Sequence, residues 1–320
     1  MSSTASTSVN AQKKKAGIIK YLKKKFSREG ELWIIAILML IWVAIFAYYP
    51  MFGLIIAFKK YVPGKSFTEG AWVGLEYFRQ FVTNPEFGMV LRNTLAISGL
   101  QMLFGFPAPI IFAIILNEVR AKRFKKFVQT VSYLPHFVSW VVTASIAFSI
   151  LNYDGVFNDL LMLLGIIDEP VSWLGEGKYF WGVITVANIW KGVGWSSIIY
   201  LSAIAGIDEE LYQAGAVDGL GRFGMIWHIT LPSIRTTVVL MWILAVGGIL
   251  NAGFEQQLLL GNDKTRTFYE VIDTYAYKYG VQQGRFSYGT AVGLLKGVIS
   301  VSLVFITNKI SKKILDVSVL

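Results

Sequence analysis

Long apolar segments dominate the hydrophobic pattern of the chain. Six of them are almost free of charge: 32–58, 93–117, 127–153, 179–207, 236–254 and 286–307. A helix needs about 20 mostly apolar residues to cross a hydrocarbon core. The pattern therefore predicts an all-α membrane protein with six transmembrane helices, at about 32–58, 93–117, 127–151, 180–204, 235–258 and 287–308. A shorter apolar run at 160–167, between Asp159 and Asp168, predicts an interfacial helix.

Basic residues between these segments predict the orientation of the chain. Lys and Arg near membrane ends stay preferentially in the cytoplasm. With the N-terminus inside, 18 basic residues fall in cytoplasmic segments and 10 in outer segments. We therefore expect both termini in the cytoplasm, a basic cytoplasmic tail at 1–31, an extracellular loop at 59–92, the main helical domain at 93–313 and a C-terminal tail at 314–320.

Composition excludes several classes of protein. Of 320 residues only 16% are charged, which is low for a soluble enzyme, and the chain has no cysteine and two histidines. Disulfides and thiolate chemistry are thereby excluded, and we expect no catalytic residue and no metal site. The net charge of +10 follows the predicted topology and does not indicate nucleic acid. Gly64-Lys65-Ser66 is not a P-loop, because Lys59 stands where its first glycine is needed.

The predicted cytoplasmic loop 208–232 carries the signals of a short helix outside the membrane. Asp208 suits the N-cap, and Glu209 and Glu210 suit the first turn. Gly219 is a natural C-terminal stop, and Pro232 begins the next segment. The face of this helix suits docking into a groove on a partner protein. An amphipathic connector on the lipid surface explains the same residues equally well.

The same loop contains residues at a recognisable spacing. They are Gln213, Ala214, Gly215, Gly219, Ile229, Leu231 and Pro232. The spacing resembles the cytoplasmic signature of ABC-importer permeases, Glu-Ala-Ala, three residues, Gly, nine residues, Ile, one residue, Leu-Pro. Gln213 replaces the glutamate of that signature and Gly215 replaces its second alanine. Asp218 before Gly219, with stretches such as 105–109, 116–127, 133–137 and 272–284, is similar to the maltose-type branch that takes up oligosaccharides and polysaccharide fragments.

The resemblance implies a type I ABC importer permease fold in the plasma membrane of a Gram-positive bacterium. It implies that 208–223 form a coupling helix that docks on a separate, paired ATPase, which binds ATP and magnesium. No cofactor is expected in this chain itself. A second homologous permease, an extracellular lipid-anchored sugar-binding protein and membrane lipid are the other implied partners.

Polar residues inside the predicted spans are candidates for a substrate pathway. They are Asn188, Trp190, Lys191, Asn251, Glu255, Gln256 and Lys296, with Gln257, Trp195 and Tyr200 as further candidates. A charged side chain is costly in lipid, so the two lysines should face protein or water. A structural ion pair with Glu255 as counter-ion, or a subunit contact, is the alternative to a pathway role.

Three glycines, Gly289, Gly293 and Gly297, form a flat ridge along the sixth predicted span. Such a ridge allows close helix packing within the permease. Two other functions remain open from the residues: an ion-driven secondary transporter and a membrane-integral enzyme. The spacing in 208–232 favours the importer permease over the transporter, and the lack of paired carboxylates or clustered histidines disfavours the enzyme.

Overall fold

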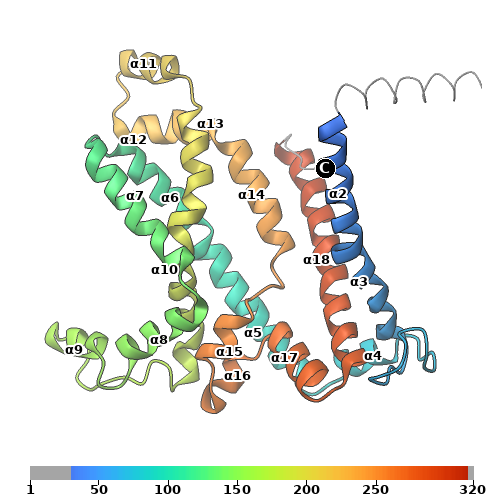
Figure 1. Cartoon of the computed structure of the whole chain (residues 1–320). Coiled ribbons are helices and arrows are strands. Elements are labelled where there is room, and N and C mark those ends of the chain that lie inside the picture. Colours follow the sequence, from blue (N-terminus) through green and yellow to red (C-terminus); the bar gives the residue numbers. More distant parts are fainter. Residues whose placement is uncertain (1–29, 316–320) are drawn as a thin grey trace, which may run out of the picture. The chain divides into compact units, whose positions relative to one another are not determined.

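The computed structural model describes residues 30–315, so the basic part of the predicted N-terminal tail lies outside the described residues (Figure 1). These residues form two compact units, one of 30–56 with 64–69 and one of 57–63 with 70–315. The first contains α2 (Gly30–Val43), the π-turn η1 (Ala44–Tyr48), α3 (Tyr49–Met51) and most of η2 (Phe52–Phe58). The run Gly30–Phe58 is long and apolar enough to cross a membrane, as predicted for 32–58.

The first long helix of the second unit contains a π-helical turn. After α4 (Glu76–Val82), α5 (Phe87–Leu100) continues through η3 (Gln101–Gly105) into α6 (Pro107–Glu118). Proline has no N–H and crowds the preceding turn. Here the turn widens, and Phe106 N donates to Gln101 O at 2.8 Å. The run Phe87–Glu118 is a candidate span and contains the predicted helix 93–117.

The third predicted span, 127–151, is not one helix. The chain forms α7 (Lys122–Phe137) and α8 (Trp140–Leu151), with extended backbone at Val138 and Ser139. Pro135 lies in the last turn of α7, and Ser139 starts α8 by accepting a hydrogen bond from Val142 N at 3.3 Å. The hydropathy pattern missed this break because both halves are apolar.

A short and a long helix follow. α9 (Val156–Leu163) begins and ends four residues earlier than the interfacial helix predicted at 160–167. The helical run Trp140–Leu163, which includes α9, is a candidate span. α10 (Gly177–Ala205) is continuous over the fourth predicted span, 180–204, and packs against α6 and α7. Its length suffices to cross a bilayer, but it is not among the helices apolar enough to qualify by composition.

The fifth predicted span, 235–258, is also interrupted. After α11 (Glu209–Val217), the chain forms α12 (Arg222–Met225), the π-turn η4 (Ile226–Thr230), α13 (Leu231–Ser233) and α14 (Arg235–Gly247). The helical runs before and after Ile234 differ in direction by 62°. Helix α14 ends at a glycine pair, and residues 250–254 are irregular before α15 (Glu255–Leu260).

The last elements return to a single long helix. They are η5 (Asp263–Thr265), α16 (Arg266–Tyr269), α17 (Ile272–Tyr277), η6 (Lys278–Gln282) and α18 (Phe286–Leu315). Helix α18 contains the sixth predicted span. Residues 30–315 thus hold four candidate spans, or five if the bent pair 222–247 is one span, so the all-α class is confirmed and the number six is not.

The core of the second unit brings distant segments together. Phe180 and Ile184 of α10 pack with Leu260 of α15 in one buried cluster. Arg266 donates to Glu86 at 2.5 Å and to the buried Glu270 at 2.6 Å. The hydrogen bond to Glu270 raises the pKa of the Arg266 guanidinium. These contacts fix the irregular segment after α14 against α5 and α10.

Candidate functional site

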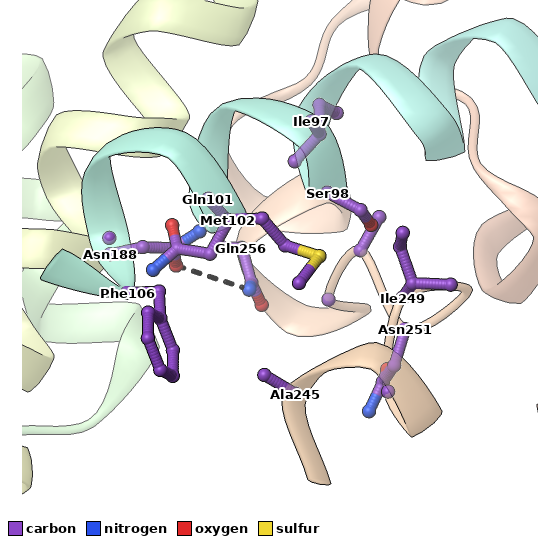
Figure 2. A pocket seen from close by; sticks show the side chains of 14 residues that line it. Ile97, Ser98, Gln101, Met102, Phe106, Asn188, Ala245, Ile249, Asn251 and Gln256 are labelled. Atoms are coloured by element: carbon purple, nitrogen blue, oxygen red, sulfur yellow. Dashed lines mark hydrogen bonds between the residues drawn. The ribbon is translucent and has the colours of Figure 1, made fainter. Parts of the chain in front are cut away.

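A cavity of about 510 Å³ lies where η3 and the irregular segment between α14 and α15 meet α10 (Figure 2). Fourteen residues line it: Ile97, Ser98, Gln101, Met102, Gly105, Phe106, Asn188, Ala245, Gly248, Ile249, Asn251, Ala252, Gly253 and Gln256. They come from α5 and its π-turn, from α10, and from the end of α14 through the start of α15. Irregular backbone at membrane depth is tolerated where it is covered by protein or lines a wet cavity.

Two glycines leave the space that amide side chains occupy in this cavity. A Cβ at Gly105 would lie 1.9 Å from Gln101 Nε2, and a Cβ at Gly253 would lie 1.8 Å from Gln256 Nε2. Gly253 also has φ +88°, a conformation that L residues rarely adopt. Gln256 Nε2 donates to Asn188 Oδ1 at 3.3 Å, which joins α15 to α10.

The wall of the cavity is polar but uncharged. Amides from Gln101, Asn188, Asn251 and Gln256 stand beside the hydroxyl of Ser98 and apolar side chains. Among the described residues, Ser98 Oγ and Gln101 Oε1 are buried without a hydrogen-bond partner. A buried polar atom without a partner costs free energy, so these two atoms have unused hydrogen-bonding capacity beside the cavity. The lining suits a neutral molecule rich in hydroxyl groups.

The structure brings together three of the predicted pathway residues, Asn188, Asn251 and Gln256. Trp190 lies elsewhere, in the wall of an apolar groove between α7 and α10. Glu255 is exposed at the start of α15 and does not line the cavity. Gln257 is buried and donates to Ala252 O at 3.0 Å. Trp195 and Tyr200 also lie outside the cavity: Trp195 stacks on His136, and Tyr200 is buried in the core.

Lys191 and Lys296, which were predicted to lie inside the membrane, have structural partners, and neither partner is Glu255. Lys191 donates to the carbonyl oxygens of Pro135 and His136, each at 3.1 Å, and to that of Val138. It thus adds a donor at the C-terminal end of α7, where a helix end leaves carbonyl groups in need of further partners. Lys296 contacts Asp273 of α17 at 2.5 and 2.6 Å. The expected counter-ion was wrong because α17 packs on α18.

Sequence reasoning missed Ser98, Gln101 and Asp273. Gln101 is a strongly polar residue within an apolar span, six residues before Pro107, and that combination was the available signal. Asp273 was placed in an outer loop, because spacing along the chain does not reveal which helix it packs against.

The predicted loop 208–232 folds as a helix followed by a π-turn. Asp208 caps α11 by accepting from Glu210 N at 3.0 Å. The helix ends with Gly219 at φ +77°. Leu220 N donates to Gly215 O at 2.9 Å and Gly219 N to Ala216 O at 3.2 Å. These two bonds are the Schellman pattern, which favours glycine at Gly219.

Packing explains why Gly215 and Ile229 occur together. A Cβ at Gly215 would lie 2.7 Å from Ile229 Cδ1, so the isoleucine occupies the space above the buried glycine. Tyr212 Oη and Thr230 Oγ1 lie 3.0 Å apart and form a second link between α11 and η4. Leu231 packs beside the core cluster around Ile234. Four other signature residues are exposed: Gln213, Ala214, Asp218 and Pro232.

The glycine ridge packs closely at only one of its three positions. A Cβ at Gly289 would lie 2.6 Å from Gly280 Cα, so α18 and η6 approach through two glycines. At Gly293 and Gly297 a Cβ would meet no atom within 4 Å among the described residues, and both glycines are exposed. The predicted packing within this chain is therefore limited to Gly289.

Sequence comparisons with known proteins agree on one class of membrane protein. Residues 105–316 match the family described as binding-protein-dependent transport system inner membrane component. Protein LplB of Bacillus subtilis (strain 168) is 46% identical over 287 residues, which are 89% of this chain and 90% of LplB. The polygalacturonan/rhamnogalacturonan transport system permease protein YteP of the same organism is 41% identical over 303 residues, covering 94% and 92% of the two chains.

A solved structure agrees with the sequence comparisons. The crystal structure of a bacterial ABC transporter involved in the import of the acidic polysaccharide alginate contains a chain that is 38% identical, with a TM-score of 0.83. The match covers 92% of this chain and 99% of that one. This chain belongs to the family of binding-protein-dependent transport system inner membrane components, the membrane-spanning permeases of ABC importers.

Membership of this family decides between the functions that the sequence left open. The chain is a transport permease and not an enzyme, and ATP hydrolysis is the task of a separate subunit. Lys191 and Lys296 each have a structural partner, so these two lysines give no support to the hypothesis of an ion-driven transporter.

Proposed function

We propose that this permease carries oligosaccharides or polysaccharide fragments into the cell by alternating access, through the cavity around Gln101, Asn188, Asn251 and Gln256. The names of its relatives support a saccharide, because they include permeases for polygalacturonan or rhamnogalacturonan and for arabinooligosaccharides. The observation that carries the proposal is the cavity itself, whose wall of amides and a hydroxyl is uncharged. Sugar hydroxyls both donate and accept, which matches carboxamide groups.

Removing the cavity amides should slow transport without uncoupling the ATPase. Gln256→Leu and Asn188→Leu each delete one partner of the 3.3 Å contact and leave the other unpaired in the wall. A lost hydrogen bond of this kind costs about 1–3 kcal/mol, so we expect saccharide uptake by the reconstituted complex to fall about tenfold. Basal ATP hydrolysis should change little, because neither side chain lies in the 208–232 loop.

The matched control is Gln283→Leu, which removes an exposed amide outside the cavity. It should transport like the wild type. Normal uptake by both cavity variants, with complexes of normal yield, would show that this cavity is not on the pathway.

We further propose the partners and the placement that this function requires. A second homologous permease completes the pathway, and paired cytoplasmic ATPase subunits bind ATP and magnesium. A lipid-anchored binding protein delivers the saccharide at the outer face. The related alginate transporter supports this arrangement, because its structure was solved in complex with an alginate pentasaccharide-bound periplasmic protein. We also propose that the chain crosses the cell membrane of a Gram-positive bacterium six times, with both termini in the cytoplasm.

Coupling to the ATPase is assigned in this proposal to the coupling helix, residues 208–223. This range contains two helices, α11 and the start of α12, and not one; Val217 at the end of α11 and Phe223 in α12 are each 88% exposed. The N-cap, the Schellman end and the Tyr212–Thr230 contact hold it in one orientation on η4. A rigid helix with an exposed apolar face suits insertion into a groove on the partner.

Distorting the end of the coupling helix should weaken coupling. Gly219→Val places a β-branched residue at φ +77°, which costs about 1–2 kcal/mol or more. We expect the stimulation of ATP hydrolysis by the loaded binding protein to fall about tenfold. Gly221→Ala is the matched control, because Gly221 has φ −72° and open space around its Cβ position. Wild-type stimulation in Gly219→Val would contradict the assignment.

A further inference from the structure

An apolar groove of about 260 Å³ lies between α7 and α10, apart from the amide-lined cavity. Phe127, Val128, Val131 and Pro135 line it from α7, and Trp190 and Val193 from α10. The α7 residues recur at intervals of three or four and extend about 12 Å along the helix axis. The groove is open to the surroundings: the side chains of Phe127 and Trp190 are 64% and 43% exposed.

The groove is lined almost wholly by apolar side chains. Its one other lining residue is Ser132, whose hydroxyl donates to Val128 O at 2.7 Å. A sugar or a peptide would therefore lose hydrogen bonds on entering it. A hydrocarbon chain would lose none, and would cover apolar side chains that are otherwise exposed.

The same stripe of α7 leads directly into a dense basic cluster. Phe124 lies one turn before Val128, with Arg123 and Lys125 on either side of it. The cluster has five cations within seven residues, Arg120, Lys122, Arg123, Lys125 and Lys126. Within residues 30–313 none of them has a carboxylate within ion-pair distance. Glu118 is the one acidic residue between Glu86 and Asp154.

We propose that this surface is a binding site for an anionic phospholipid. The phosphate headgroup contacts the basic cluster at the start of α7, and one acyl chain lies in the groove over Val131 and Pro135 against Trp190. The basic cluster and the apolar groove follow one another along α7, as the charged headgroup and the acyl chain follow one another in a phospholipid. Basic clusters beside a membrane segment attract anionic headgroups electrostatically. A zwitterionic lipid fits the groove but lacks net charge for the cluster.

The test uses the complete transporter in liposomes that contain phospholipids with brominated acyl chains, which quench nearby tryptophans. The fluorescence of Trp190 is obtained as the difference between the wild type and Trp190→Phe, because the chain has ten tryptophans. At equal low mole fraction, brominated phosphatidylglycerol should quench this signal at least fivefold more than brominated phosphatidylcholine. Equal quenching by the two lipids would overturn the proposal. The basic cluster is unchanged in this comparison, so the result does not depend on a variant of the headgroup site.

Two variants assign the selectivity to its parts. Arg120→Gln, Arg123→Gln and Lys125→Gln combined should reduce the preference for phosphatidylglycerol to below twofold. The matched control replaces Lys309, Lys312 and Lys313 of α18 by Gln and should keep the preference. Retention of the preference in the first variant contradicts the site. Absence of quenching by either lipid also contradicts it, and would indicate that another protein, such as a second permease, covers the groove.

Discussion

Replacing Gly194 by alanine should prevent α7 and α10 from packing as they do. A Cβ at this position would lie 2.0 Å from the carbonyl oxygen and 2.4 Å from the carbonyl carbon of Ser132. Both atoms belong to the backbone of α7, so no side-chain rotation relieves the overlap. Overpacking against side chains costs about 1–3 kcal/mol, and a rigid helix backbone should cost more. We expect little intact complex in detergent, measured by size-exclusion chromatography.

Gly192 supplies the control for this prediction on the same helix. A Cβ at Gly192 would meet no atom within 4 Å, so Gly192→Ala should give wild-type yield and thermal stability. It should even favour the helix slightly, since alanine has the higher helix propensity. A normal Gly194→Ala complex would mean that the close approach of α7 and α10 does not exist in the membrane.

The second large effect is expected from Lys191→Met. Methionine keeps the length of the side chain but removes the donor that satisfies the carbonyls of Pro135, His136 and Val138. Hydrogen bonds to charged groups contribute about 1.5–3 kcal/mol each, and unsatisfied carbonyls at membrane depth add to the loss. We expect the unfolding temperature of the complex, measured by tryptophan fluorescence, to fall by about 5–10 °C.

Lys191→Arg separates this structural role from a role in transport. The guanidinium keeps a charge and several donors, so the variant should recover most of the lost stability. If Lys191 contacted the substrate instead, the methionine variant would keep its unfolding temperature and lose uptake. That outcome would contradict the capping role.

Local signals predicted the parts of the fold that depend on a few neighbouring residues. Asp208 and Gly219 mark the ends of α11 within two residues, because capping is decided by the side chain and φ angle at each end. The all-α class follows from the apolar segments for a similar reason, since each helix satisfies its own backbone in lipid. These features need no knowledge of the rest of the chain.

Interruptions of the helices were not predictable in the same way. A hydropathy window averages over the two extended residues at Val138 and Ser139, and over the irregular segment near Gly253. The partner of Lys191 is a set of backbone carbonyls about 55 residues away, which no residue type reveals. Two of the five polar side chains that line the cavity, those of Ser98 and Gln101, were missed. Asn188, Asn251 and Gln256 were chosen for their polarity, whereas Gln101 reaches the cavity from the π-helical turn η3.

The uncharged wall of the cavity has a consequence for energetics across the membrane. Moving one elementary charge through a potential of 100 mV involves about 2.3 kcal/mol. The fourteen lining residues carry no ionisable side chain, and Lys296 with Asp273 forms a neutral pair. When the site alternates between the two faces, these groups contribute no net gating charge. The membrane potential therefore acts on none of the side chains that line the cavity, whereas Lys191 of α10 keeps its charge among backbone carbonyls.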